Sequence, residues 1–287
     1  MHDKKFDEIP NLEKVKLIAI DVDGTTLDDW GNLPDGLFPT MQAIMDKGIK
    51  MAVASGRPIF NLRELFQPMT NDLIIISDNG GKAEFHGEPV YSESLSKKEL
   101  ESFWKYFEEH DHIGVLIGEN EAYLSRSNSN AKEDIEYFMT AVTLVDNLNE
   151  VDSPITKISI YFPDKTSLES YNDFYKKDFE KDYSVTIGGI DWVDVMPMSV
   201  SKGRAILHLQ DEFNIDKSET LVVADNYNDL SMMEEADFSF AVASANDDIR
   251  AAAKYIGPSN NDGAVVKIMQ AVLNAYNLRA DKDSAKQ

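Results

Sequence analysis

Two aspartates, Asp21 and Asp23, stand one residue apart at the end of an apolar run, and this pair constrains the fold more than any other feature. Residues 17–20 (LIAI) are apolar, and a Gly-Thr pair follows at residues 24–25. Such a run, ended by glycine, is typical of a strand buried on both faces of a sheet. Side chains alternate along a strand, so both carboxylates would share one side if the strand reached Asp23, and there they would repel each other unless a cation intervened. Because Mg2+ prefers oxygen ligands, this strand end is a candidate Mg2+ site.

Strands and helices alternate on either side of this pair. Apolar runs at 51–54 and 73–76 are expected to form strands, and helices are expected at about 37–47 and 58–67. Strand–helix–strand alternation predicts a parallel sheet with right-handed crossovers. The alternation of strands and helices resumes after residue 201. We therefore predict an α/β fold whose core is a Rossmann-like, doubly wound parallel sheet.

The middle third of the chain differs, because it mixes hairpins with helices. A hairpin is expected around residues 188–189 (GG), and a capping box at 166–169 (TSLE) predicts a helix to about residue 182. This pattern is typical of an α+β insertion. We divide the chain accordingly into a catalytic core of residues 1–93 and 193–287 and an inserted cap domain of residues 94–192.

Composition excludes several classes of protein. The formal charge of −23 argues against nucleic acid as a partner, and no stretch approaches the twenty apolar residues of a membrane span. The absence of cysteine excludes disulfides and thiolate metal sites. The first eight residues lack the apolar region of a secretory signal, so the cytoplasm is the expected location. We expect a monomer or a weak homo-oligomer.

Polar residues gather at the places where this fold forms its ligand crevice. In a doubly wound sheet the ligand binds at the carboxyl ends of the strands. The residues at those ends, or at the start of a helix beside them, are Asp21, Asp23, Ser55, Lys202, Asp225, Asn228 and Asp229. Carboxylates bind a metal, whereas a hydroxyl, a glycine amide and a lysine bind an anion. A metal and an anion in one crevice indicate phosphoryl chemistry.

Together these segments resemble the haloacid dehalogenase-like phosphatases of the Cof type, subfamily IIB. The matching motifs are 21–25 (DVDGT), 54–58 (ASGRP), 201–203 (SKG) and 225–232 (DNYNDLSM), with a weaker match at 261–265 (NDGAV). The SG and KG pairs are weak signals alone, but four motifs in this order are specific, and the resemblance covers nearly the whole chain. Two positions depart from the family pattern: Ala224 replaces a glycine, and residues 244–247 (SAND) replace a Gly-Asn-Ala run.

The resemblance implies a role for each acid at the strand ends. Asp21 would be the nucleophile and form an aspartyl-phosphate. Asp23 would protonate the leaving oxygen and then activate water. Mg2+ would be held by the carboxylates of Asp21 and Asp225 and by the backbone carbonyl of Asp23. The implied enzyme is a phosphoric monoester hydrolase that acts on a small phosphorylated metabolite, with sugar phosphates the leading class.

The resemblance also implies a set of phosphate ligands. These are Ser55, the Gly56 amide, Lys202 and Asn228, and Lys202 would contribute to catalysis by neutralising charge. Asp229 would orient Lys202 or a metal-bound water. Arg57 would contact the substrate, and the alternative is that it forms only an ion pair on the surface.

Structural readings compete with these roles. Ser55 could cap the following helix, Lys202 could be a solvated lysine, and Asn228 could be a turn residue. Two other functions also use this set of residues. One is a phosphotransferase or mutase that passes the phosphoryl group to a sugar hydroxyl, and the other is a non-catalytic protein that binds a phosphorylated ligand.

Overall fold

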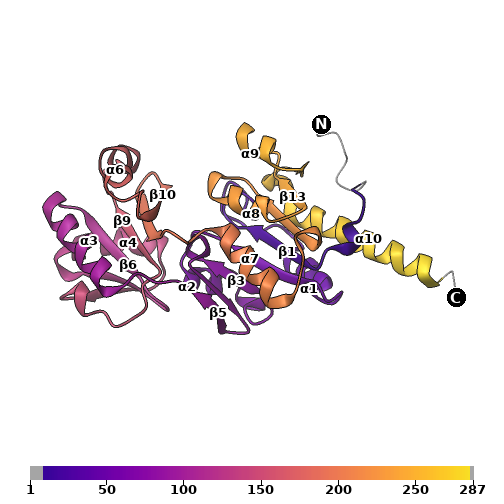
Figure 1. The fold of residues 1–287 in the computed structure, drawn as a ribbon, viewed down its shortest axis with the longest axis horizontal. Helices are drawn as coiled ribbons and strands as arrows, with labels where there is room; N and C mark the ends of the chain where they lie inside the picture. Colours follow the sequence, from indigo (N-terminus) through magenta and orange to yellow (C-terminus); the bar gives the residue numbers. More distant parts are fainter. Residues whose placement is uncertain (1–8, 285–287) are drawn as a thin grey trace.

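The chain forms two β-sheets with helices around them (Figure 1). The computed structural model describes residues 9–284. The eight-stranded sheet has the order β14 (Tyr255–Ile256), β13 (Phe238–Ala241), β12 (Thr220–Ala224), β1 (Leu17–Asp21), β2 (Lys50–Ala54), β3 (Ile74–Ser77), β4 (Lys82–Phe85) and β5 (Glu88–Ser92). Neighbouring strands from β14 to β3 are parallel, and β4 and β5 are antiparallel additions at one edge.

The first strand lies between the two halves of this sheet. The strands β2 and β3 follow β1 on one side of it in the sheet. The strands β12, β13 and β14, which come after the insertion in the sequence, lie on its other side. Every residue of β1 and β12 is buried, as the apolar runs predict. The order of strands therefore reverses between β1 and β12, and the crevice at such a reversal is where doubly wound folds bind ligands.

Helices cover the eight-stranded sheet. They are α1 (Leu37–Met45), α2 (Ile59–Leu65), α7 (Lys202–Phe213), α8 (Leu230–Glu234), α9 (Asp247–Ala252) and α10 (Ala264–Ser284). Helix α1 packs against α10, and α7 packs against α8. The predicted α/β fold is confirmed. Among the described residues, no helix is both long and apolar enough to cross a membrane. Residues 1–8, for which we expect no secretory signal, lie outside the described residues.

The second sheet has six strands and its own apolar clusters, and it lies to one side of the first (Figure 1). Its order is β10 (Tyr183–Gly189), β11 (Trp192–Pro197), β9 (Lys157–Tyr161), β6 (Ile113–Ile117), β7 (Ala122–Ser125) and β8 (Val142–Val145). Its helices are α3 (Lys97–His110), α4 (Lys132–Phe138), α5 (Ser167–Ser170) and α6 (Lys176–Asp178). We propose that this sheet and its helices form the inserted cap domain. Because β11 pairs with β9 and β10, we move the second boundary of that domain from residue 192 to the end of Pro197.

Two local predictions inside the insertion are wrong. The helix expected from 166 to about 182 is interrupted by a π-helical segment at Tyr171–Tyr175, and the predicted capping box does not form. The Thr166 hydroxyl instead donates a hydrogen bond to Asp164, at 2.7 Å. The hairpin does not turn at residues 188–189, because Gly189 still pairs with Trp192 and the turn falls on residues 190–191.

A left-handed turn after β3 brings the first half of the core against the start of α7. The φ angles of Asp78, Asn79 and Gly80 are +52°, +55° and +100°. A Cβ atom on Gly80 would lie 2.2 Å from the carbonyl oxygen of Ser201, the residue that caps α7. Only glycine allows this approach, so the turn fixes the position of α7 relative to β3.

We predict that Gly80→Ala lowers the free energy of unfolding by about 3 kcal/mol, because it adds a backbone clash to left-handed strain. Gly87→Ala is the matched control. Gly87 has φ +75° but nothing lies within 4 Å of its added Cβ, so its cost is strain alone. That cost should be about 1 kcal/mol. Urea denaturation of both variants measures the difference, and equal losses would contradict the proposed contact.

Candidate active site

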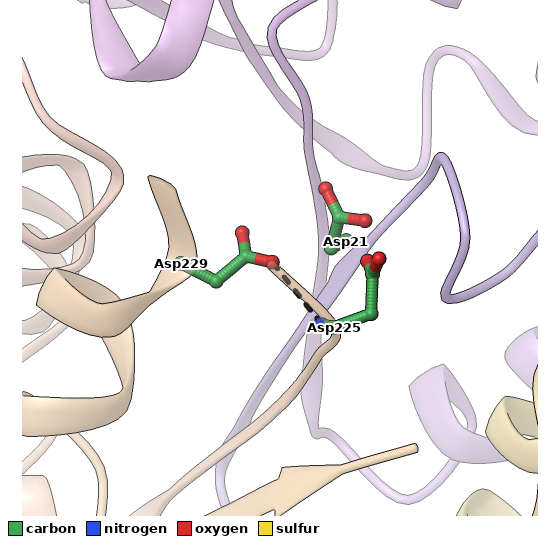
Figure 2. A group of neighbouring side chains, drawn as sticks. All are labelled: Asp21, Asp225 and Asp229. Atoms are coloured by element: carbon green, nitrogen blue, oxygen red, sulfur yellow. Dashed lines mark hydrogen bonds between the residues drawn. The ribbon is translucent and has the colours of Figure 1, made fainter. Parts of the chain in front are cut away.

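Three carboxylates converge at the point where the strand order reverses (Figure 2). Asp21 is the last residue of β1, Asp225 directly follows β12, and Asp229 ends the short 3-10 helix Tyr227–Asp229. One oxygen from each lies within 4.8 Å of the others. Because β1 and β12 are adjacent parallel strands, Asp21 and Asp225 must lie close together. The sequence placed all three aspartates in one crevice, and the structure brings them together.

Lys202 binds two of these carboxylates. It is the first residue of α7, its side chain has 0% exposure, and Ser201 caps the helix through its hydroxyl. Its Nζ atom donates to Oδ1 of Asp21 at 2.5 Å and to Oδ1 of Asp229 at 2.6 Å. The other oxygen of Asp229 accepts the backbone N–H groups of Asp225 and Asn226. Lys202 is therefore not a solvated lysine, and Asp229 joins it to the loop that carries Asp225.

The electrostatics of the cluster leave negative charge unbalanced. Burial raises the pKa of Asp21 well above its usual value, and Asp229 raises it further, although Lys202 acts against both. Burial also raises the pKa of Asp225, against a hydrogen bond from Thr25 at 2.7 Å. Burial lowers the pKa of Lys202, but Asp21 and Asp229 outweigh it and leave this pKa above its usual value. Three carboxylates thus share one ammonium group.

The same residues fit a divalent cation. Oδ2 of Asp21 is buried and has no hydrogen-bond partner among residues 9–284, although a carboxylate oxygen out of water needs one. The surrounding acidic groups offer only oxygen atoms, which suit a hard cation such as Mg2+. Gly24 keeps the space beside Asp225 open, since a Cβ atom there would lie 2.5 Å from Oδ2 of Asp225.

A second group of residues carries the other acid of the pair. Asp23 lies outside the three-carboxylate cluster, and its side chain is 54% exposed. Arg57 donates to Oδ1 of Asp23 from Nη2 at 2.6 Å and to Oδ2 from Nε at 3.0 Å. The Ser55 hydroxyl donates to Oδ2 of Asp23 at 3.4 Å and accepts the backbone N–H of Arg57 at 3.1 Å. Ser55 does not cap α2, which begins after Pro58.

Asn228 is paired with a residue that the sequence analysis missed. Its Nδ2 atom donates to Oδ1 of Asn79 at 2.9 Å. Asn79 lies in the left-handed turn after β3 and also borders Gly56, where a Cβ atom would lie 3.1 Å from its Oδ1. The Asn79-Gly80 pair at a strand end was the available signal for this residue.

A cavity of about 840 Å³ opens over these residues. The eight-stranded sheet contributes Asp21, Asp23, Ser55, Gly56, Arg57, Asn79 and Asn228 to its lining. The six-stranded sheet and its connections contribute Met139, Lys157, Ser159, Tyr171, Val185, Thr186, Trp192 and Asp194. The cavity therefore lies between the two sheets. Lys202 is not in its lining, because it is buried against Asp21 and Asp229.

Comparison with known proteins agrees with this geometry. The family model of haloacid dehalogenase-like hydrolases matches residues 18–269, which include every residue of the site. The chain belongs to this family. The match confirms two predictions, that the chain is a member of this family and that it is a hydrolase. A solved structure named as a subclass IIB sugar phosphatase superposes with a TM-score of 0.72 at 21% identity, covering 89% of this chain and 98% of that one, in agreement with the expected Cof-type, subfamily IIB fold.

Curated relatives of the family match over most of their length. A 5-amino-6-(5-phospho-D-ribitylamino)uracil phosphatase of Escherichia coli is 28% identical over 90% of this chain and 96% of its own. A phosphatase of the same name from Bacillus subtilis is 25% identical over 91% of this chain and 99% of its own. A solved structure of a HAD/Cof-like hydrolase from Plasmodium vivax superposes with a TM-score of 0.82, at 21% identity, over 94% and 100% of the two chains.

We predict that Lys202→Met lowers the free energy of unfolding at neutral pH by about 3–5 kcal/mol, because it leaves two buried carboxylates without their cation. The matched control is Lys16→Met, which removes an exposed ion pair with Glu219 at 2.6 Å. That variant should change stability far less, because an exposed ion pair is screened by water. Denaturant titration compares the two, and similar effects would contradict the central place of Lys202.

Proposed function

We propose that this protein is a Mg2+-dependent phosphatase that hydrolyses a small phosphorylated metabolite in the cytoplasm, with sugar phosphates as the leading class. One observation carries the proposal: Asp21, which lies next to Asp225 and lines the cavity, has one oxygen bound by Lys202 and the other without a partner in the part of the chain that the structure describes. The names of the curated relatives, which are phosphatases, support it.

Asp21 is the proposed nucleophile. Lys202 holds its carboxylate in place, and this carboxylate would form a bond to phosphorus as the bond from phosphorus to the leaving oxygen breaks. Asp23 would supply the proton to that oxygen. Asp23 would then take a proton from water as the water attacks phosphorus, which releases phosphate and restores Asp21.

The remaining residues would hold the phosphoryl group and its charge. Mg2+ would be held by the carboxylates of Asp21 and Asp225 and by the Asp23 carbonyl, where it would neutralise charge on the transferring group. Ser55, the Gly56 amide and Asn228 would bind phosphoryl oxygens, and Lys202 would add positive charge through Asp21. Arg57 pairs with Asp23, so the alternative of an ion pair holds in this structure, and we propose that Arg57 also reaches the substrate.

We predict that Asp21→Asn lowers kcat for p-nitrophenyl phosphate by at least about 1000-fold, because an amide is not a nucleophile and loses its charge. EDTA should abolish the activity of the unchanged protein, and added Mg2+ should restore it. Asp35→Asn, an exposed aspartate outside the cavity, is the control and should keep the parent rate. An Asp21→Asn protein with the parent rate, or full activity in EDTA, would refute the mechanism.

Hydrolysis is favoured over phosphoryl transfer because the curated relatives are named phosphatases. Transfer to a sugar uses the same intermediate, so product analysis with and without an acceptor sugar separates the two reactions. Formation of inorganic phosphate in equal amount to the substrate consumed, with the acceptor present, is the expected result. A new phosphorylated sugar would instead favour the phosphotransferase, and absence of any turnover would favour the ligand-binding alternative.

The substrate is best sought in a panel of phosphorylated metabolites. The panel should include 5-amino-6-(5-phospho-D-ribitylamino)uracil, the substrate in the names of several relatives, beside hexose and pentose phosphates. We expect kcat/KM values to differ among panel members by 10-fold or more, on the order of the effect of one or two hydrogen bonds to the leaving group. Equal values throughout would contradict selection by the cavity.

A further inference from the structure

Lys157 extends from the six-stranded sheet to a loop of the eight-stranded sheet. It is the first residue of β9 and is 3% exposed. Its Nζ atom donates to the carbonyl oxygen of Gly56 at 2.8 Å and to Oδ2 of Asp194 at 3.0 Å. Oδ1 of Asp194 in turn accepts the Ser159 hydroxyl at 2.6 Å. Its Nζ atom also lies 3.9 Å from Oδ1 of Asp78, in the turn after β3. The lysine is therefore fixed within its own sheet by Asp194 and bound to the other sheet through Gly56 and Asp78.

The group that Lys157 binds is part of the proposed phosphate site. The carbonyl of Gly56 and the N–H of Arg57 belong to one peptide, and this N–H donates to Oγ of Ser55 at 3.1 Å. A peptide is planar, so fixing its oxygen also fixes the direction of its N–H. A continuous path of bonds thus runs from Lys157 through one peptide to the hydroxyl of Ser55.

The helix that follows this loop is bound to the same sheet. Phe60 of α2 is buried in an apolar cluster that otherwise consists of residues of the six-stranded sheet and its connections. Asn61 donates to the carbonyl oxygen of Phe138 at 2.7 Å. The loop of Ser55, Gly56 and Arg57 is therefore held from the insertion at both of its sides, by Lys157 and by α2.

We propose that Lys157 is a positioning residue for phosphoryl binding, which orients the Ser55 hydroxyl through the Gly56–Arg57 peptide. This inference rests on the proposed function, since it takes the Ser55 loop to be a phosphate site. It follows that the phosphate site is complete only when the six-stranded sheet lies against the loop. The insertion then contributes to binding of the phosphoryl group itself, in addition to covering the cavity.

Inorganic phosphate tests this role because it has no leaving group for Lys157 to contact. Its inhibition constant against p-nitrophenyl phosphate hydrolysis is measured with Mg2+ present. Lys157→Met should raise this constant about tenfold, the effect of one lost hydrogen bond to a charged donor. This change leaves two buried carboxylates, Asp194 and Asp78, without their cation. The double variant Lys157→Met/Asp194→Asn, which removes the charge of the nearer one, is therefore measured as well, and it should show the same rise.

Lys82 provides the matched control. It is also a lysine with 4% exposure, and it also bridges the two sheets, since its Nζ atom contacts Glu119 at 3.2 Å. Among the described residues, Lys82 forms no hydrogen bond or ion pair with residues 55–57. Lys82→Met should therefore leave the phosphate inhibition constant within about twofold of the parent value, below the effect of one hydrogen bond.

A double-mutant cycle with Ser55→Ala separates positioning from a general structural effect. If Lys157 acts through Ser55, Lys157→Met should raise the constant by less than about twofold once the hydroxyl is absent. Additive effects would overturn the proposal. So would an unchanged phosphate constant together with a raised KM for larger substrates, which would assign Lys157 to the leaving group. If the parent protein, without any substitution, neither binds phosphate nor hydrolyses p-nitrophenyl phosphate, the proposed function and this inference are both refuted.

Discussion

The site depends on the ammonium group of Lys202, which lies between the carboxylates of Asp21 and Asp229 and has no exposed surface. A buried charge persists only when it is paired and hydrogen-bonded, and here both partners lie within hydrogen-bond distance. Asp229 also binds two backbone N–H groups next to Asp225. One lysine thereby joins β1, α7 and the loop after β12 into a single rigid group.

This arrangement also explains why the site calls for a cation. Lys202 compensates part of the charge of Asp21 and Asp229, but Asp225 adds a third carboxylate and Asp21 keeps an oxygen without a partner. An oxygen-only site with excess negative charge favours Mg2+. The contact between Lys202 and Asp21 therefore orients the carboxylate for attack on phosphorus and also leaves an excess of negative charge that a metal ion would balance. The six-stranded sheet completes the cavity above it.

The sequence predicted the centre of the molecule well because its signals are local. The strands β1, β2, β3 and β12 are short apolar runs, and parallel strands place their carboxyl ends at one edge. Proximity of Asp21, Asp225 and Asp229 follows from that rule, whereas their roles came from a resemblance to a family and stay predictions. The burial of Lys202 could not be read from its motif, since it depends on the packing of α7 against the turn at Gly80.

The insertion was predicted less well because its structure depends on distant contacts. Lys157 begins a strand of alternating pattern, so it looks like a solvent-facing residue, but residues far apart in the sequence, Gly56 and Asp194, bind its buried ammonium group. The missing cap at Thr166 has a local cause instead, because its hydroxyl donates to Asp164, two residues earlier in the chain. Asn79 was missed since a left-handed turn, which the sequence shows only as Asn-Gly, directs it to Asn228.

Chemical trapping of the phosphorylated enzyme tests the central claim most directly. The protein would be mixed with excess substrate and Mg2+, quenched within milliseconds and treated with borohydride, which reduces an acyl phosphate to an alcohol. Peptide mapping by mass spectrometry then locates the reduced side chain. We expect reduction at Asp21 alone, dependent on substrate. Reduction at another carboxylate, or an unmodified Asp21 during rapid turnover, would contradict it.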